Sequence, residues 1–172
     1  MSTPLILHTH LKNTDLHALS AFEAITLYLG YTPLKRLRRF TRWELEFSNP
    51  KTQTTDLIRI LEGSYVLLNV NKEAYFHGEI PQISLEKNNH LFLVTVAPKT
   101  SDNSDTMLQE IFQKTEVALK SLKKFLIWEI WVQSSASRSE LEKELLEKVI
   151  VTSAQHKGLL VNPLYETTQF LA

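Results

Sequence analysis

The chain contains no cysteine and only four glycines, and each shortage removes a class of function. Without cysteine there can be no disulfide, thiolate zinc site, iron–sulfur cluster or cysteine nucleophile. The four glycines are scattered, so the sequence has no glycine-rich loop for binding phosphate. No apolar run approaches the roughly 18 residues of a membrane-spanning helix. We therefore expect no cofactor and no catalytic residue of the kinds that these motifs mark.

The chain also lacks net charge, since Lys+Arg and Asp+Glu number 19 each in 172 residues. A neutral protein has no overall field that would attract nucleic acid or an anionic membrane surface, so neither is an expected partner. With 43% hydrophobic and 22% charged residues, the composition is that of a soluble globular protein. The opening residues lack a basic leader and a small-residue cleavage site, which favours a cytoplasmic location.

The sequence does contain one segment twice. LKRLRRFTRWELEF, Leu34–Phe47, recurs 85 residues later as LKSLKKFLIWEIWV, Leu119–Val132. Six pairs are identical in this register: Leu34/Leu119, Lys35/Lys120, Leu37/Leu122, Phe40/Phe125, Trp43/Trp128 and Glu44/Glu129. A match of this size predicts an internal duplication, with the flanking elements recurring in the same order.

Hydrophobic periodicity predicts the same five elements in each half: strand, helix, long strand, helix, strand. In the first half the signals are a strand at Leu5–Leu11, a helical stripe (Leu16, Leu19, Phe22, Ile25 and Leu29) that ends at Gly30, alternation from Arg42 to Phe47, a short helix at Leu57–Leu61 and an extended segment at Val66–Phe76. In the second half they are a strand at Leu91–Val96, a helical stripe (Met107, Leu108, Ile111 and Phe112), the strand around Trp128, a helix that begins with a capping box at Ser137 and Glu140, and a closing segment at Leu159–Phe170.

This pattern predicts an α+β fold in which two ferredoxin-like βαβαβ repeats with mainly antiparallel sheets pack as a pseudo-dimer. The expected boundaries are 1–77 for the first repeat, 78–89 for a linker and 90–172 for the second repeat. Three strands and two helices bury little apolar surface, so a single repeat would be marginal alone. Covalent joining of two copies supplies the missing contacts.

The closing segment Leu159–Glu166, LLVNPLYE, resembles the "LLANPVIEDYE" ending of the PurS family, the small subunit of phosphoribosylformylglycinamidine synthase. Ala21–Ala24 leading to Leu29–Tyr31 is similar to the first helix of that family and its "ALGY" exit. Leu37–Arg39 before Trp43–Glu46 is similar to its long strand. The likeness covers both halves, so the chain looks like a tandem form of a unit that is usually single and dimeric.

The resemblance implies a non-catalytic accessory subunit in de novo purine biosynthesis. Such a subunit joins the glutaminase and ATP-dependent synthetase subunits and helps to define the path of ammonia released from glutamine, so the ligase reaction belongs to the assembled complex. Two departures from the family pattern stand out. Its Gly-Lys pair is replaced by Arg39-Phe40 and by Lys124-Phe125, and its Asn-Pro pair survives only as Asn162-Pro163, with Asn69-Val70 in the first repeat.

The predicted partner-binding residues combine basic, aromatic and closing-segment positions. They are Arg38, Arg39, Arg42, Lys123, Lys124, Trp131, Asn162 and Pro163. The basic members belong to the only concentration of positive charge, which is more typical of a solvated rim or a contact with acidic partner surfaces than of a nucleic-acid site. Trp131 stands three residues after Trp128 on a strand, so the two rings must point to opposite faces. We therefore predict that Trp131 is mostly buried, against the other repeat or another protomer.

Two alternatives remain open at this point. His8 and His10 would share a strand face and could bind a metal with Glu44 or Glu46, although a histidine-bearing edge or interface is the favoured interpretation and no metal is expected. The competing function is a ferredoxin-like regulatory module that binds a small molecule or RNA. Further homo-oligomerisation is also compatible with the sequence.

Overall fold

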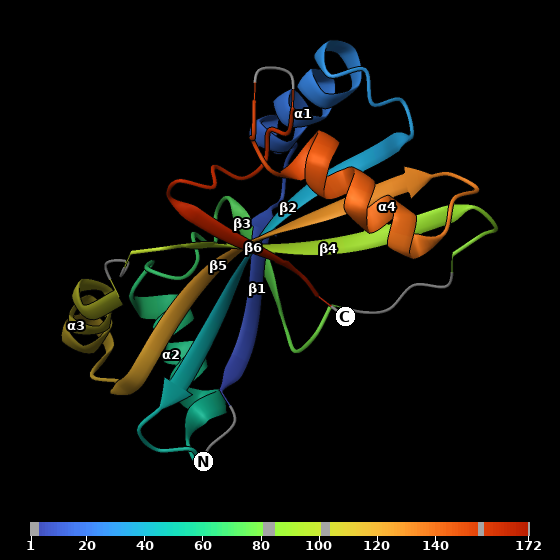
Figure 1. The fold of residues 1–172 in the computed structure, drawn as a ribbon. Helices are drawn as coiled ribbons and strands as arrows, with labels where there is room; N and C mark the ends of the chain where they lie inside the picture. The colour runs from blue at the N-terminus through green and yellow to red at the C-terminus, as the bar shows by residue number, and fades with distance from the viewer. Residues whose placement is uncertain (1–3, 81–84, 101–103, 155–156, 172) are drawn as a thin grey trace. The chain divides into compact units, whose positions relative to one another are not determined.

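The fold is given by a computed structural model that describes residues 4–80, 85–100, 104–154 and 157–171. Among the described residues, strands and helices alternate on either side of residues 78–88, where β3 is followed directly by β4 (Figure 1). The elements are β1 (Leu5–Leu11), α1 (Leu16–Glu23) with its π-helical continuation η1 (Ala24–Tyr28), β2 (Leu34–Phe47), α2 (Gln53–Gly63), β3 (Glu73–His77), β4 (Asn89–Pro98), α3 (Ser104–Thr115), β5 (Leu119–Gln133), α4 (Arg138–Leu145) with its π-helical continuation η2 (Leu146–Ile150), and β6 (Glu166–Phe170). The predicted α+β class and the predicted order of elements are confirmed.

The strands form a six-stranded antiparallel sheet in the order β3-β1-β2-β5-β4-β6. In β1, His8 lies between Arg42 of β2 and Phe76 of β3. In β4, Thr95 lies between Ile127 of β5 and Gln169 of β6. The short strands β3 and β6 stand at the two edges. This arrangement is compatible with a ferredoxin-like fold.

The chain divides into two compact units, and each unit takes segments from before and after residues 78–89. Unit 1 comprises residues 1–13, 40–81 and 101–125, and therefore holds β1, α2, β3 and α3. Unit 2 comprises residues 14–39, 82–100 and 126–172, and holds α1, β4, α4 and β6. The long strands β2 and β5 contribute one half to each unit.

The core of unit 1 packs alternate strand residues against α2 and α3. Its fully or nearly fully buried side chains include Leu7, Trp43, Leu45, Phe47, Leu57, Ile60, Leu61 and Ile111. Trp43, Leu45 and Phe47 follow each other at the period-two spacing that puts strand side chains on one face. Their neighbours Arg42, Glu44 and Glu46 therefore point to the opposite face of the sheet, which we call the second face of unit 1.

The core of unit 2 packs its strands against α1 and α4 in the same manner. Buried members include Ala18, Ile25, Phe92, Val94, Trp128, Ile130, Leu141, Leu145 and Val149. The capping box is present, because Ser137 and Glu140 each bond the other's backbone N–H. The predicted stripe of Leu141, Leu145 and Val149 is fully buried, as expected. Leu93, Glu129 and Trp131 alternate with the core residues and define the second face of unit 2.

In unit 1, α2 and α3 lie side by side (Figure 1), and both helices end in the same way. The hydroxyl of Ser64 donates to the carbonyl of Ile60 at 2.8 Å, and that of Thr115 donates to the carbonyl of Ile111 at 2.7 Å. The next residue in each case has a left-handed backbone, Tyr65 with φ 56° and Glu116 with φ 60°. Hydroxyl caps of this kind satisfy carbonyls that the helix end leaves unpaired.

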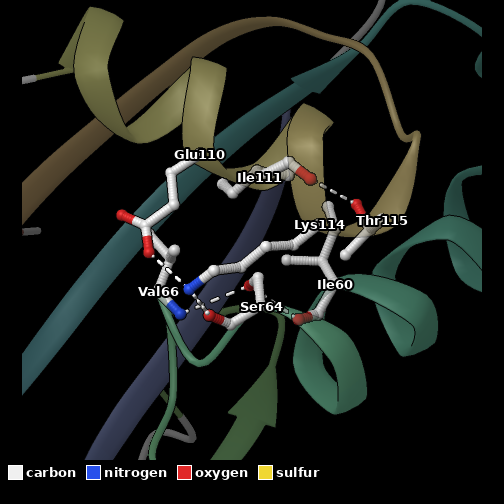
Figure 2. A network of polar contacts seen from close by, with 7 residues as sticks. All are labelled: Ile60, Ser64, Val66, Glu110, Ile111, Lys114 and Thr115. Carbon is white, nitrogen blue, oxygen red and sulfur yellow. Dashed lines mark hydrogen bonds and ion pairs between the residues drawn. The ribbon is translucent and has the colours of Figure 1, made fainter.

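Lys114 joins these two helix ends (Figure 2). Its ammonium group donates to the carbonyl of Ser64 at 3.2 Å and to the carboxylate of Glu110 at 2.6 Å. A Cβ added at Gly63 would lie 3.1 Å from the methyl group of Thr115, so the helices approach closely at this point. A side chain at the end of α2 would therefore displace Thr115 by a few tenths of an ångström.

The predicted stripe of the first helix was wrong in its first two turns. Leu16 and Leu19 are 68% and 43% exposed, whereas Ala18 and Ile25 are buried. Alanine is too small to mark a stripe by hydropathy, so the periodicity favours the larger leucines in its place. The π-helical turn after Glu23 then changes the residue spacing, which a fixed 3.6-residue period does not anticipate.

The boundaries of other elements also differ from the prediction. The second helix begins at Gln53 rather than Leu57, and the strand predicted from Leu91 already begins at Asn89. Neither closing segment is extended throughout, because each contains a turn before the strands β3 and β6 begin. Residues 81–84 of the predicted linker lie outside the described residues.

Candidate functional site

The segment that carries the family resemblance forms a turn around Asn162. The Asn162 side-chain oxygen accepts from the Leu164 N–H at 3.0 Å, and its backbone carbonyl accepts from the N–H groups of Tyr165 and Glu166 at 3.1 and 2.9 Å. The Glu166 carboxylate accepts from the Asn162 N–H at 2.8 Å. Asn162 is thus the organising residue of the turn, because asparagine can bond the backbone two residues ahead.

The segment around Asn69 forms the same set of bonds in unit 1. The Asn69 side chain accepts from Asn71 at 3.1 Å, and its carbonyl accepts from Lys72 and Glu73 at 2.9 and 2.8 Å. The Glu73 carboxylate accepts from the Asn69 N–H at 2.7 Å. Asn69 and Glu73 therefore match Asn162 and Glu166 bond for bond, with a constant offset of 93 residues, although the proline is missing.

A lysine also binds each turn. The ammonium groups of Lys12 and Lys99 donate to the carbonyls of Val70 and Pro163, respectively. Pro163 is replaced by valine without loss of any of these bonds, so the turn depends on asparagine and glutamate rather than on proline. Sequence reasoning selected Pro163 and missed Glu166.

The tip of the Asn162 turn carries two large apolar side chains that sequence reasoning also missed. Leu164 and Tyr165 are 75% and 69% exposed. Both belong to the LLVNPLYE segment, so their position after the Asn-Pro pair was the available signal. Exposed apolar groups beside Asn162 and Pro163 are suited to contact with another protein.

Among the predicted basic residues, Arg39 is committed to a bond inside unit 2. Its Nε and Nη2 atoms lie 2.9 and 3.2 Å from the two carboxylate oxygens of Asp15. The same carboxylate caps α1 by accepting from the N–H groups of His17 and Ala18. The Arg39 guanidinium also lies 6.0 Å from the centre of the Trp128 ring. Arg39 therefore fastens the start of α1 to the sheet.

Arg38 and Trp131 converge on Glu129 on the second face of unit 2. The Trp131 indole N–H donates to a Glu129 carboxylate oxygen at 2.7 Å, and Arg38 Nη1 lies 3.7 Å from the same oxygen. The Glu129 residue is only 4% exposed. Its buried negative charge is tolerable because an ion pair and a hydrogen bond compensate the lost hydration. Trp131 itself is half-buried in the single chain, and its burial against another protomer stays a prediction.

The three basic residues of unit 1 have different surroundings. Arg42 bonds Glu44 at 3.1 Å and Glu79 at 3.3 Å, and little of its side chain is exposed. The exposed Lys124 places its ammonium group 5.0 Å from the centre of the Trp43 ring. Lys123 is exposed. Arg39 and Arg42 are thus held in ion pairs within their own units, and neither exposed lysine has such a carboxylate partner within the described residues; all four stay predicted contact residues.

An aromatic cluster around two histidines occupies the second face of unit 1. His8 is fully buried and stacks on Phe76 with ring centres 4.8 Å apart. The His10 ring lies 5.6 Å from that of Phe40, which lies 6.1 Å from that of Phe76. Neither ring nitrogen of His8 makes a hydrogen bond of good geometry within the described residues. Burial lowers the pKa of His8, and the charge of Arg42 lowers it further, although the backbone of Gly78 is near enough to raise it in part.

Within the described ranges, no three histidine or acidic side chains are grouped in a way that could hold a metal ion. The hypothesis that Glu44 or Glu46 completes a site with His8 and His10 therefore gains no support. Glu44 bonds Arg42, and Glu46 pairs with Lys120 at 3.7 Å. In the part of the chain that the structure covers, no helix has the length and apolar character needed to cross a membrane.

Comparisons of the chain with protein-family models, curated proteins and solved structures find no match.

Proposed function

We propose that the chain is a tandem PurS-like protein whose two repeats form a covalent pseudo-dimer. The matched turns at Asn69 and Asn162 support a duplication, because four backbone and side-chain bonds recur at corresponding residues. The long strands support it as well, since β2 begins 85 residues before β5 and both carry a buried tryptophan at the same position. In a pseudo-dimer, segments of one repeat pack against segments of the other. The division into two units that each combine segments of both repeats is consistent with this arrangement.

We infer further that this protein is a cytoplasmic, non-catalytic accessory subunit of phosphoribosylformylglycinamidine synthase. In this role it bridges the glutaminase and synthetase subunits and helps to channel ammonia during purine biosynthesis. The observation that carries the proposal is the Asn162 turn. The residues on which the family resemblance rests are the ones that build this turn, and they present Leu164 and Tyr165 to solvent.

The proposal is tested by reconstitution with the glutaminase and synthetase subunits from the same organism. We expect the three proteins to co-purify, and we expect glutamine-dependent synthesis to require the chain while synthesis from added ammonia does not. This contrast isolates bridging and channelling from the ligase chemistry. A synthase that is fully active with glutamine in the absence of the chain would refute the proposal. Tight binding of RNA or an amino acid by the isolated chain would favour the regulatory alternative.

A second experiment addresses the surface of the turn. Leu164→Ser with Tyr165→Ser should abolish co-purification while leaving the free energy of unfolding nearly unchanged, because both side chains are mostly exposed. The matched control is Asn71→Ser with Lys72→Ser, which alters the corresponding positions in the turn of unit 1. Equal losses for the two double variants would mean that binding does not distinguish the turns, and no loss for either would exclude them as contacts.

A further inference from the structure

His8 is a histidine in a position where a charge would be poorly accommodated. It is fully buried in the middle of β1, and its ring stacks on Phe76 at an interplanar angle of 17°. The corresponding residue of unit 2, 85 positions later, is Leu93. An apolar side chain is therefore compatible with this site in the strand, and the histidine is a feature of unit 1 alone.

The charged and titratable groups that face His8 come from β1 itself, from β2 and from the segment just after β3. Arg42 of β2 lies directly opposite it, and Glu44 follows on the same face. His10 lies two residues further along β1. Glu79, just after β3, pairs with Arg42 at 3.3 Å. Since Arg42 is itself bonded to both carboxylates, neither Glu44 nor Glu79 is available to compensate a new positive charge on His8 at full strength.

The partner of the stacked ring belongs to the least supported strand of the unit. Phe76 lies in β3, a five-residue edge strand whose neighbour in the sheet is β1. His8 and Phe76 are paired in register, so their stack is part of the contact that holds β3 in place. Short edge strands have few partners and open at low free-energy cost.

We propose that protonation of His8 releases β3 from β1, which makes unit 1 an acid-sensitive part of the molecule. The closed strand requires a neutral imidazole, because a buried imidazolium next to Arg42 would lose its hydration and experience like-charge repulsion. In the open strand the ring is hydrated and takes up a proton near its ordinary pKa of about 6.5. Acid therefore favours the open form.

The direction of the pH effect follows from linkage. The pKa of His8 in the folded protein is lowered, chiefly by burial and then by Arg42, while Glu79 and the backbone of Gly78 act in the opposite direction without reversing the result. The open state binds more protons than the closed state below about pH 6.5, so protection of β3 decreases as the pH falls. One linked proton corresponds to about a tenfold change for each pH unit.

The experiment is hydrogen exchange of the full chain, followed by mass spectrometry from pH 7.5 to 5.5 and corrected for intrinsic exchange rates. We expect peptides that contain β3 to lose protection towards a limiting slope of about tenfold per pH unit. Peptides that contain β6, the opposite edge strand, should show no such change. A flat profile for β3 would overturn the proposal, and so would an equal loss at β6, because the opening would then not be local.

Two variants identify the responsible group. His8→Leu, which copies the residue of unit 2, should make the protection of β3 independent of pH in this range. His77→Gln is the matched control, since His77 is an exposed histidine of β3 on the other face and its loss should leave the slope unchanged. If His8→Leu does not fold, titration of the His8 ring by NMR in the unaltered protein decides the question. A ring that titrates at or above pH 6.5 would contradict the proposal.

Discussion

The second faces of the two units carry different kinds of side chain at corresponding positions, on β1 and β2 in unit 1 and on β4 and β5 in unit 2. His8 and Arg42 in unit 1 stand where unit 2 has Leu93 and Ile127. Glu46 in unit 1, which pairs with Lys120, stands where unit 2 has Trp131. Unit 1 thus presents buried or paired polar groups, and unit 2 presents mainly apolar ones around a single buried carboxylate. The comparison indicates that the second face of unit 1 and the second face of unit 2 are suited to different contacts.

The helix-facing sides of the two units are, by contrast, alike. Trp43 and Trp128 are 3% and 5% exposed, and each has a basic side chain over its ring, Lys124 in unit 1 and Arg39 in unit 2. Such contacts contribute about 0.5–1 kcal/mol at exposed sites. Similar cores with different second faces are expected when packing constrains the helix-facing side of the sheet more strictly than the other side.

The largest expected effect tests the similarity of the cores. Trp43→Ala and Trp128→Ala should each lower the free energy of unfolding by about 3–5 kcal/mol, because each removes a large buried ring and leaves a cavity. Denaturant titration followed by circular dichroism measures both losses. The phenylalanine variants serve as controls, since they retain most of the volume. Losses that differ by more than about 2 kcal/mol would show that the two cores are not energetically equivalent.

The next prediction tests the difference between the second faces through assembly. Trp131→Ala should weaken assembly with a partner or a further protomer by about 2 kcal/mol, roughly a thirtyfold rise in Kd, because a half-buried tryptophan that becomes desolvated at an interface is a typical anchor. Glu46→Ala, at the corresponding position, should have a smaller effect. Sedimentation and binding measurements on both variants decide this. An unchanged Kd for Trp131→Ala would remove the proposed role of this face.

Much of the fold could be predicted from the sequence, because strand alternation, the capping box at Ser137 and the left-handed Gly30 depend on local residue patterns. The exposure of Leu16 and Leu19 could not, since the small Ala18 marks the buried side of α1 and hydropathy favours the larger leucines. The grouping of segments from before and after residues 78–89 into each unit depends on long-range contacts, which no local pattern contains. For the same reason, the Asp15–Arg39 pair was not predicted.

The candidate site shows the same limit. Sequence reasoning identified the Asn162 segment, but it treated Arg38, Arg39 and Arg42 alike. The structure separates them by their partners, because strand neighbours point to opposite faces. The positive charge of an arginine does not by itself show which carboxylate will lie beside it in the fold.

A smaller effect is expected from the shared glutamate position. Glu129→Ala should lower the free energy of unfolding by about 1–3 kcal/mol, because it leaves the Trp131 N–H and Arg38 without their buried acceptor. Glu44→Ala should cost less than about 1 kcal/mol, since Glu44 is more exposed and Arg42 keeps Glu79. Thermal or chemical unfolding of both variants provides the comparison. Glu129→Gln retains an acceptor oxygen and should recover part of the loss; if it does not, the hydrogen bond from Trp131 is not the cause.

The smallest effect concerns the helix starts that correspond in the two units, Thr52 before α2 and Ser137 before α4. Ser137 accepts from the Glu140 N–H and completes a capping box, whereas the Thr52 side chain bonds no N–H of its helix and instead lies 2.6 Å from the Asp56 carboxylate. Ser137→Ala should therefore lower the free energy of unfolding by about 1 kcal/mol, the usual loss for a helix cap. Thr52→Ala should change it by less than half as much. Because both substitutions remove one exposed hydroxyl, the difference between them isolates the cap. If parallel denaturant titrations show equal losses for the two variants, the capping box at Ser137 does not stabilise its helix more than Thr52 stabilises α2.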